Sequence, residues 1–349
     1  MKRCLGCMEE YEENLNICPN CEYKEDTPIN RNYCLLPGTI LNSENNNYLI
    51  GKSIDADNSG VVYIAWDNAY KRKVVIREYM PSEFSTRYPN NISVAVCEEE
   101  KEHFEMLMDK FVYEAYQLRK IDDDGIIKIF DVFYQNNTAY IVMEYVEGIT
   151  LSEFMIDNGK LNPKIAIDLL MPIMLVTEKI HSLGEIHKTI HTENIMVTKT
   201  GSLKLLDLNF VRYELNYGYP TSCRVLLGLD SEYLALELWR KNRECGTYSD
   251  IYSLAAILYK MITSNKPEYA LDRSFNLERI GKDSLEPIKK FNKEVPKNIK
   301  NAIYNGMNIE IQDRTQTVRQ FIEELTSDEP VELRVKPHSI IDRIKQKLR

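Results

Sequence analysis

The sequence predicts an α+β protein with two unequal lobes that follow a small cysteine-rich module. Residues 37–131 alternate short β-branched runs with turn residues, a pattern typical of strands. After Gly148 helical periodicity dominates, and half of the eight cysteines lie in the first 21 residues. We therefore predict a module at 1–23, a linker at 24–36, a first lobe at 37–147, a second lobe at 148–325 and a charged tail at 326–349.

The elements of each lobe follow from the spacing of apolar residues. Alternating runs predict five strands in the first lobe, at 48–54, 60–66, 73–80, 126–135 and 138–146. One amphipathic helix is expected between the third and fourth of these, at 103–121. The second lobe is expected to hold helices at 151–159, 163–183 and across 249–325, with a strand hairpin at 195–208.

Composition is that of an ordinary globular protein, with 44% hydrophobic and 28% charged residues among 349. The formal net charge of −9 does not favour a nucleic-acid partner. The sequence has no run of 18 apolar residues and no apolar segment of signal-peptide type near Met1. We therefore expect a cytoplasmic protein, in which clustered cysteines bind metal more often than they form disulfides.

The first four cysteines form two pairs, Cys4-x2-Cys7 and Cys18-x2-Cys21. Four thiolates in two such pairs predict a closed tetrahedral zinc site of structural type. A module this short cannot bury a core, so the metal is expected to stabilise its fold. A redox pair or incidental cysteines are the alternatives. The remaining cysteines lack such spacing and are expected to be ordinary thiols: Cys34, Cys97, Cys223 and Cys245.

Eight motifs after the module occur in the order found in protein kinases. They are VVIREYM at the third strand, Glu114 in the following helix, MEYVEG at the hinge, HKTIHTEN at the catalytic loop, KLLDLN at the D-F-G segment, and Glu237, Asp250 and Arg314. The chain resembles a bacterial, eukaryotic-like Ser/Thr protein kinase with an N-terminal zinc ribbon. The resemblance implies a bilobal protein-kinase fold, with a five-stranded N-lobe and a mainly helical C-lobe, and use of ATP and Mg²⁺.

The expected nucleotide-binding residues of the first lobe depart from the family pattern. Only Gly60 remains of three loop glycines, and aspartates at 55 and 57 are expected to repel a triphosphate unless the segment is simply a tight turn. Arg77 replaces the strand lysine and is expected to pair with Glu114, with Lys73 as an alternative in another register. The resemblance places Met143, as gatekeeper, and Tyr145 at the hinge.

The catalytic loop has lost its aspartate, because Thr189 stands in its place. Threonine is no base near neutral pH, so Glu193 and His191 are the candidate substitutes, while His187 is expected to be structural. Asn194 and Asp207 match the magnesium ligands of the family, unless they merely cap turns. Activation-segment hydroxyls that phosphorylation could reach are Thr221, Ser222 and Ser231.

Scaffold positions are thus kept and chemical positions altered. This pattern favours a pseudokinase that signals by binding a protein partner or a kinase, with weak or no ATP binding. The alternatives are a weakly active Ser/Thr kinase, and a kinase-fold transferase that moves the AMP part of ATP. The basic end of the tail, with Ile340, Ile341, Ile344 and Leu348 on one helical face, is expected to be solvated rather than to contact an acidic membrane or a partner helix.

Overall fold

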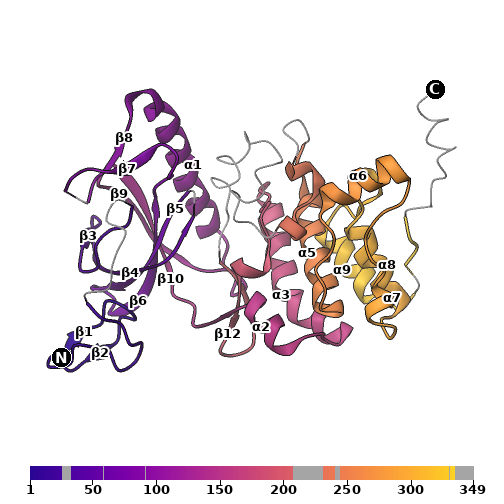
Figure 1. The fold of residues 1–349 in the computed structure, drawn as a ribbon, viewed down its shortest axis with the longest axis horizontal. Helices are drawn as coiled ribbons and strands as arrows, with labels where there is room; N and C mark the ends of the chain where they lie inside the picture. Colours follow the sequence, from indigo (N-terminus) through magenta and orange to yellow (C-terminus); the bar gives the residue numbers. More distant parts are fainter. Residues whose placement is uncertain are drawn as a thin grey trace. The chain divides into compact units, whose positions relative to one another are not determined.

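The computed structural model describes residues 1–25, 33–57, 59–90, 92–206, 231–239, 244–329 and 331–334. Two compact units are present, and each is described by itself. The first unit comprises Met1–Asp122 and Ile127–Val146; the second comprises Asp123–Ile126 and the described residues from Glu147 onward (Figure 1). The predicted tail from residue 335 onward lies outside the described residues.

A six-stranded antiparallel sheet forms the core of the first unit, in the order β3-β4-β5-β6-β10-β9. The strands are β3 (Ile40–Asn42), β4 (Asn47–Asp57), β5 (Gly60–Asp67), β6 (Arg72–Tyr79), β9 (Ile129–Gln135) and β10 (Thr138–Glu144). The prediction of five strands in the first lobe was wrong, because it missed β3 and also the short β7 (Ser85–Arg87) and β8 (Val94–Val96). β3 pairs with β4 from Ile40↔Leu49 to Asn42↔Asn47, and three residues are too few to show alternation in the sequence.

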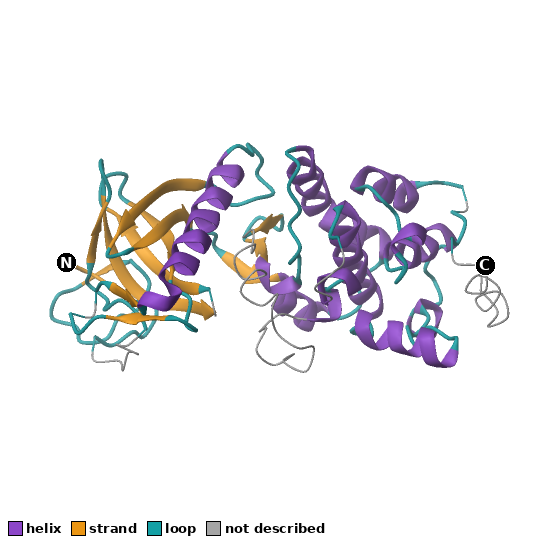
Figure 2. Ribbon diagram, turned by 90° about the horizontal axis from the view of Figure 1, so that it is seen from above, coloured by secondary structure: helices purple, strands orange, loops and turns teal. Residues whose placement is uncertain are grey.

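The predicted helix of this unit is confirmed as α1 (Lys101–Arg119), which follows a short 3-10 turn, η1 (Glu98–Glu100). Its buried residues recur at helical spacing, and α1 packs against β9 and β10. Figure 2 shows the helix of the first unit lying against the strands of that unit. The Tyr79 ring on β6 lies 4.9 Å from the Phe104 ring and 5.5 Å from the Phe111 ring, measured between centroids. A separate hairpin, β7 (Ser85–Arg87) with β8 (Val94–Val96), precedes the helix.

The end of the predicted linker belongs to the hydrophobic core of the first unit. Cys34 and Leu35 are buried among side chains of β4, β5 and β6. The Leu35 backbone N–H donates a hydrogen bond of 2.9 Å to the Tyr63 hydroxyl. The polar residues before them suggested a linker, but Cys34 and Leu35 pack against the sheet as part of its core.

The second unit is mainly helical, as predicted. It opens with β11 (Gly148–Thr150), α2 (Leu151–Asn158) and α3 (Pro163–Ser182), followed by η2 (Thr192–Asn194) and the hairpin β12 (Ile195–Thr198) and β13 (Leu203–Leu205). Then come η4 (Ser231–Tyr233), η5 (Leu236–Trp239), α5 (Thr247–Thr263), α6 (Ala270–Ile280), α7 (Ile288–Phe291), α8 (Lys297–Gly306), η6 (Ile311–Asp313) and α9 (Val318–Thr326).

The helix α5 is the centre of this unit, since it is buried on every side and contacts α3, α7, α8 and α9. The first two helices of this unit begin with side-chain caps. Thr150 and Glu153 form a capping box at α2, and Asn162 caps α3 ahead of Pro163.

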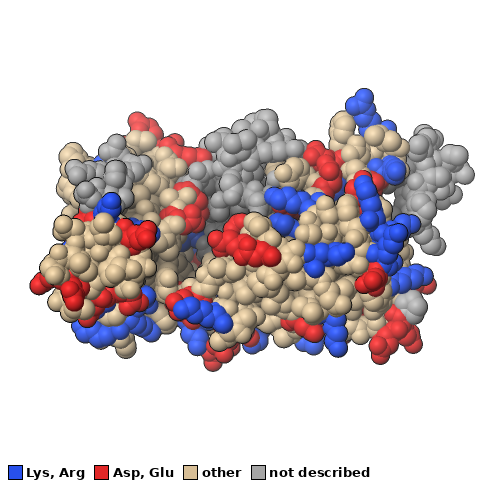
Figure 3. All heavy atoms as spheres, turned by 60° about the horizontal axis from the view of Figure 1, so that its bottom comes forward, with Lys and Arg blue, Asp and Glu red and all other residues tan. Residues whose placement is uncertain are grey.

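Charged side chains of both signs are interspersed over each unit on the face shown in Figure 3. Among the described residues, no helix combines the length and apolar character needed to cross a bilayer.

Candidate functional site

The four cysteines predicted to bind metal are brought together at one point of the first unit, beside a small hairpin of β1 (Lys2–Arg3) and β2 (Glu10–Tyr11). Their sulfur atoms all lie within 4.8 Å of one another. The Cys4–Cys21 and Cys7–Cys18 Sγ distances are 3.6 Å and 3.8 Å. A tetrahedral zinc ion with bonds of about 2.3 Å needs sulfurs about 3.8 Å apart, so these four thiolates fit it.

The cysteine module, residues 1–25, packs directly on the sheet. The Lys52 backbone N–H of β4 donates to the Leu5 carbonyl at 2.7 Å, where the pairing of β4 with β5 shifts register. The Arg3 guanidinium lies 3.5 Å from the centre of the Trp66 ring, and Lys73 forms an ion pair with Glu9. This close docking makes the module part of the first unit.

Gly51 permits this approach. A Cβ atom at Gly51 would lie 2.3 Å from the Met8 methyl carbon and 2.4 Å from the Leu5 carbonyl oxygen. Any larger residue would therefore push the module away from β4.

The turn between β4 and β5 is closed by one carboxylate. Asp57 Oδ1 accepts hydrogen bonds from the Ser59 N–H at 2.7 Å, the Ser59 hydroxyl at 2.6 Å and the Gly60 N–H at 3.2 Å. Asp57 therefore occupies backbone donors that could otherwise bind an external anion. The sequence allowed two interpretations of Asp57, as part of a tight turn or as a charge that repels a triphosphate. The two are compatible, because Asp57 closes the turn with a charged carboxylate.

Arg77 reaches the same turn from the middle of β6, where it is 4% exposed. Its Nη2 atom donates to the Ser59 hydroxyl at 2.7 Å and lies 3.5 Å from Asp57 Oδ2. The predicted Arg77–Glu114 ion pair stays a prediction; Glu114 is buried on α1.

The predicted hinge residues lie at the end of β10. Met143 is buried opposite Val75 of β6, and the Tyr145 ring centre lies 5.6 Å from the Lys73 ammonium nitrogen. Lys73 thus contacts both the cysteine module and the expected hinge.

In the second unit, Asp250 at the start of α5 holds the loop before η2. Its carboxylate accepts the backbone N–H groups of His187 and Lys188 at 2.8 Å and 2.7 Å. His181 Nε2 lies 2.7 Å from the same carboxylate. Asp250 therefore holds the loop through backbone N–H groups, which do not depend on the identity of the side chains at 187 and 188.

Thr189 is fully buried in this loop, and its hydroxyl lies 3.4 Å from His187 Nδ1. Burial lowers the pKa of His187 from 6.5 to about 4, although the charge of Asp250 opposes this shift. His187 is accordingly neutral at neutral pH and packed as a structural residue. Neither group offers an accessible base.

Asn194 is held inside the same loop. Its Nδ2 atom donates to the Thr189 carbonyl at 2.7 Å, and its Oδ1 atom accepts the His191 N–H at 3.1 Å. His191 is buried, whereas Glu193 is exposed. Three further residues predicted for the second lobe lie outside the described residues: Asp207, Thr221 and Ser222.

A buried ion pair links η5 to the end of η6 in this unit. Arg314 and Glu237 form a two-bonded ion pair, at 2.5 Å and 3.1 Å, with both side chains fully buried. The Ser249 hydroxyl adds a third bond to Glu237 at 2.7 Å. The resemblance to protein kinases implies this pairing, because the arginine at the position of Arg314 pairs with the glutamate at the position of Glu237 in that family.

Comparison with known proteins decides the family. The model of the protein kinase domain matches residues 58–343. The chain belongs to the protein kinase family. A probable serine/threonine-protein kinase of Clostridium acetobutylicum is 30% identical over 83% of this chain and 40% of its own length. The serine/threonine-protein kinase PrkC of Bacillus subtilis is 30% identical over 56% of this chain and 30% of its own length.

Among solved structures, the apo form of PpkA-294 has the same fold, with a TM-score of 0.68 and 24% identity, covering 84% of this chain and 99% of that chain. This kinase domain spans less than half the length of the two curated relatives named here. Members of the family use ATP and Mg²⁺.

One polar cluster of this kinase N-lobe was missed in the sequence. Glu78 on β6 and Arg87 on β7 form an ion pair of 2.5 Å with both side chains fully buried. The hydroxyls of Tyr63 and Tyr140 donate to Glu78 at 2.8 Å and 2.9 Å. The only hint in the sequence was a glutamate inside an apolar strand run, VVIREYM.

Proposed function

We propose that this kinase-fold chain is a pseudokinase, which signals by binding a protein partner or a kinase and does not depend on phosphoryl transfer. The observation that carries the proposal is the Asp57 carboxylate in the β4–β5 turn. In active kinases a glycine-rich loop covers the ATP phosphates at this turn. Here the amides of Ser59 and Gly60 are already bound to an anion supplied by the chain itself.

A triphosphate would have to displace that carboxylate to use the same amides. Each hydrogen bond to a charged group contributes about 1.5–3 kcal/mol. The displaced Asp57 would then stand beside the phosphates, where like charges about 4 Å apart repel by about 1 kcal/mol even in water. Both terms oppose nucleotide binding.

The buried Thr189 of the second unit supports the same proposal independently. A general base raises the rate of proton transfer by typically 10²–10⁴-fold. The hydroxyl at this position lies against neutral His187 and is fully shielded from solvent. The loop is nonetheless kept in place by Asp250, as expected if its architecture serves binding.

A weakly active Ser/Thr kinase is the second candidate, and the comparisons favour it over the pseudokinase, since the curated relatives named above are called Ser/Thr kinases. This candidate needs His191 or Glu193 to replace the missing base. Glu193 is exposed and therefore free to meet an acceptor hydroxyl. The relatives are longer than this chain, so their activity comes to it only as a hypothesis.

The test is a thermal-shift titration of the zinc-loaded protein with ATP, with and without Mg²⁺, followed by transfer assays with labelled ATP. A ligand that binds only the folded state raises the melting temperature as its concentration exceeds Kd. The pseudokinase proposal predicts no shift at millimolar ATP and no transfer. Transfer from γ-labelled ATP that Asp207→Ala abolishes would establish the kinase instead. Transfer from α-labelled ATP alone would identify a nucleotidyl transferase.

A further inference from the structure

The chain that follows α9 stays bound to the second unit after that helix has ended. Its described residues here are Ser327–Glu329 and Val331–Arg334, which form no helix or strand, and we call them the strap. Three asparagines of α8, spaced by three and four residues, lie on one face of the helix. Their Nδ2 atoms donate hydrogen bonds to strap carbonyls in chain order: Asn298 to Ser327 at 2.6 Å, Asn301 to Val331 at 2.7 Å and Asn305 to Glu332 at 3.0 Å.

Asn305 pairs with the strap through both ends of its side-chain amide. It is fully buried, and while its Nδ2 atom donates to Glu332, its Oδ1 atom accepts the Arg334 backbone N–H at 3.0 Å. An amide that bonds a C=O and an N–H of one segment takes the place of a neighbouring β-strand, as in peptide recognition by strand addition. These contacts involve only the strap backbone, so they do not select its side chains.

Arg334 adds a contact that does select a side chain. Its guanidinium forms an ion pair with Glu324 of α9 and donates to the Thr315 hydroxyl at 3.0 Å. The Thr315 hydroxyl donates in turn to the Glu324 carboxylate at 3.1 Å. A carboxylate beside a hydroxyl matches the planar guanidinium, with its several donors, better than the point charge of lysine. The residues that contact the strap, which we call the α8–α9 site, are Asn298, Asn301, Asn305, Thr315 and Glu324.

The two sides of this contact are buried to very different extents. On the receptor side, Asn305 and Thr315 are fully buried and Glu324 is nearly so. Of the seven described strap residues, none is buried. A segment with few buried apolar contacts belongs to the low-stability end of a fold and opens without global unfolding. The helices thus present a preformed site, and its occupant is held mainly by polar contacts.

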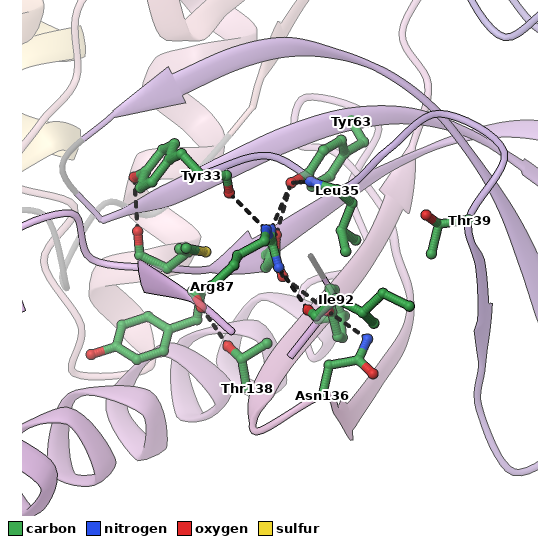
Figure 4. Close-up of polar contacts among 12 residues, drawn as sticks. Tyr33, Leu35, Thr39, Tyr63, Arg87, Ile92, Asn136 and Thr138 are labelled. Atoms are coloured by element: carbon green, nitrogen blue, oxygen red, sulfur yellow. Dashed lines mark hydrogen bonds and ion pairs between the residues drawn. The ribbon is translucent and has the colours of Figure 1, made fainter. Parts of the chain in front are cut away.

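A structural arginine of the first unit shows the contrast. The Arg87 side chain is fully buried, pairs with Glu78 and donates to the carbonyls of Tyr33 and Ile92 (Figure 4). The Arg334 side chain is 28% exposed. Because water already reaches the Arg334 guanidinium, its ion pair is easier to exchange than a fully buried one.

We propose that the α8–α9 site recognises an extended segment of a partner protein that carries arginine, and that the strap is a displaceable internal occupant of this site. Charge complementarity is the reason for choosing arginine, because Glu324 and Thr315 already bind a guanidinium. The proposal gives the proposed function a binding surface and a partner chemistry. It rests on that function only in taking the partner to be a protein.

The first test titrates a labelled peptide with the sequence of residues 327–334 into the zinc-loaded full chain carrying Arg334→Ala, which weakens the internal occupant. Fluorescence anisotropy should show binding about tenfold tighter than to the unmodified chain, where the strap competes. A peptide in which alanine replaces the arginine should bind about tenfold more weakly. The matched control replaces the leucine at position 333, which is exposed in the strap, and should leave affinity unchanged.

The second test changes the receptor. Adding Glu324→Gln to the Arg334→Ala chain should weaken peptide binding about tenfold, whereas Glu323→Gln, at an exposed position of α9, should not. Arg334→Lys serves in place of Arg334→Ala if the latter does not fold, since lysine keeps the charge and loses the planar group.

Three results would overturn the proposal. They are no peptide binding to the strap-weakened chain, an affinity that does not depend on the arginine of the peptide, and a dimer of the unmodified chain that Arg334→Ala dissociates, since a second copy is then the partner. Equal affinity of the modified and unmodified chains would overturn the role of the strap as a competitor. These measurements do not involve ATP, so their failure is separable from failure of the pseudokinase proposal.

Discussion

Replacing Asp57 by asparagine tests whether the turn excludes phosphate by its own charge. Asparagine keeps an oxygen that accepts from the Ser59 and Gly60 amides, so the turn is preserved while the charge is removed. Two unit charges 4 Å apart interact by about 1 kcal/mol in water and about 4 kcal/mol near a protein surface. The Asp57 side chain is 16% exposed, between these limits. We expect ATP to bind more tightly by about 1–3 kcal/mol, roughly 5- to 150-fold.

Isothermal titration of the zinc-loaded variant with MgATP measures this gain. The matched control is Asp55→Asn, because the Asp55 carboxylate is bound to its neighbour's N–H, that of Ala56, and to no amide of the turn itself. Its effect should be the smaller of the two. Equal ATP affinity in Asp57→Asn and the unmodified protein, at equal melting temperature, would refute the argument. It would mean that nucleotide does not approach these amides.

Three further predictions concern stability. His187 has a pKa of about 4 in the folded state against 6.5 in the unfolded state, so its contribution to folding stability is complete above about pH 6.5. That contribution is lost as the pH falls to about 4, by about 3 kcal/mol. Denaturant unfolding should show that this pH dependence of stability vanishes in His187→Gln and persists in His103→Gln, an exposed site. Arg314→Ala leaves the buried Glu237 charge unpaired and should cost about 3–5 kcal/mol by chemical unfolding, and a loss below 1 kcal/mol would contradict a rigid pair. Gly51→Ala should destabilise the fold by about 1–3 kcal/mol through overpacking and so lower the melting temperature. Zinc content by atomic absorption should stay at one ion per chain. Loss of zinc from this variant would show that docking and metal binding are a single event.

The sequence predicted the fold well because kinase motifs are local and ordered. The resemblance to kinases implies the long-range pairing of Arg314 with Glu237, which spacing alone cannot supply, whereas the contacts of Asp250 with the loop before η2 were not predicted. β3 escaped prediction because a three-residue edge strand has no periodicity of its own.

Residues whose role depends on tertiary partners were harder to interpret. A glutamate in a strand is normally exposed, and nothing local shows that Glu78 meets Arg87 and two tyrosine hydroxyls in the core. Asp57 was expected either to repel phosphate or to form a turn. Its part in binding amides became visible only with the turn and Arg77 in place.

The contact between Lys52 and Leu5 also bears on how this protein is made. The cysteine module precedes β4 in the chain, so it leaves the ribosome before β4, and we expect it to bind zinc there as a short peptide. The Leu5 carbonyl is then ready to receive the Lys52 N–H as soon as that part of β4 emerges. A module that folds first would give β4 a hydrogen-bonding partner before β5 and the later strands of the sheet are synthesised. Zinc supply during translation would then influence the yield of folded kinase domain more than zinc supply afterwards.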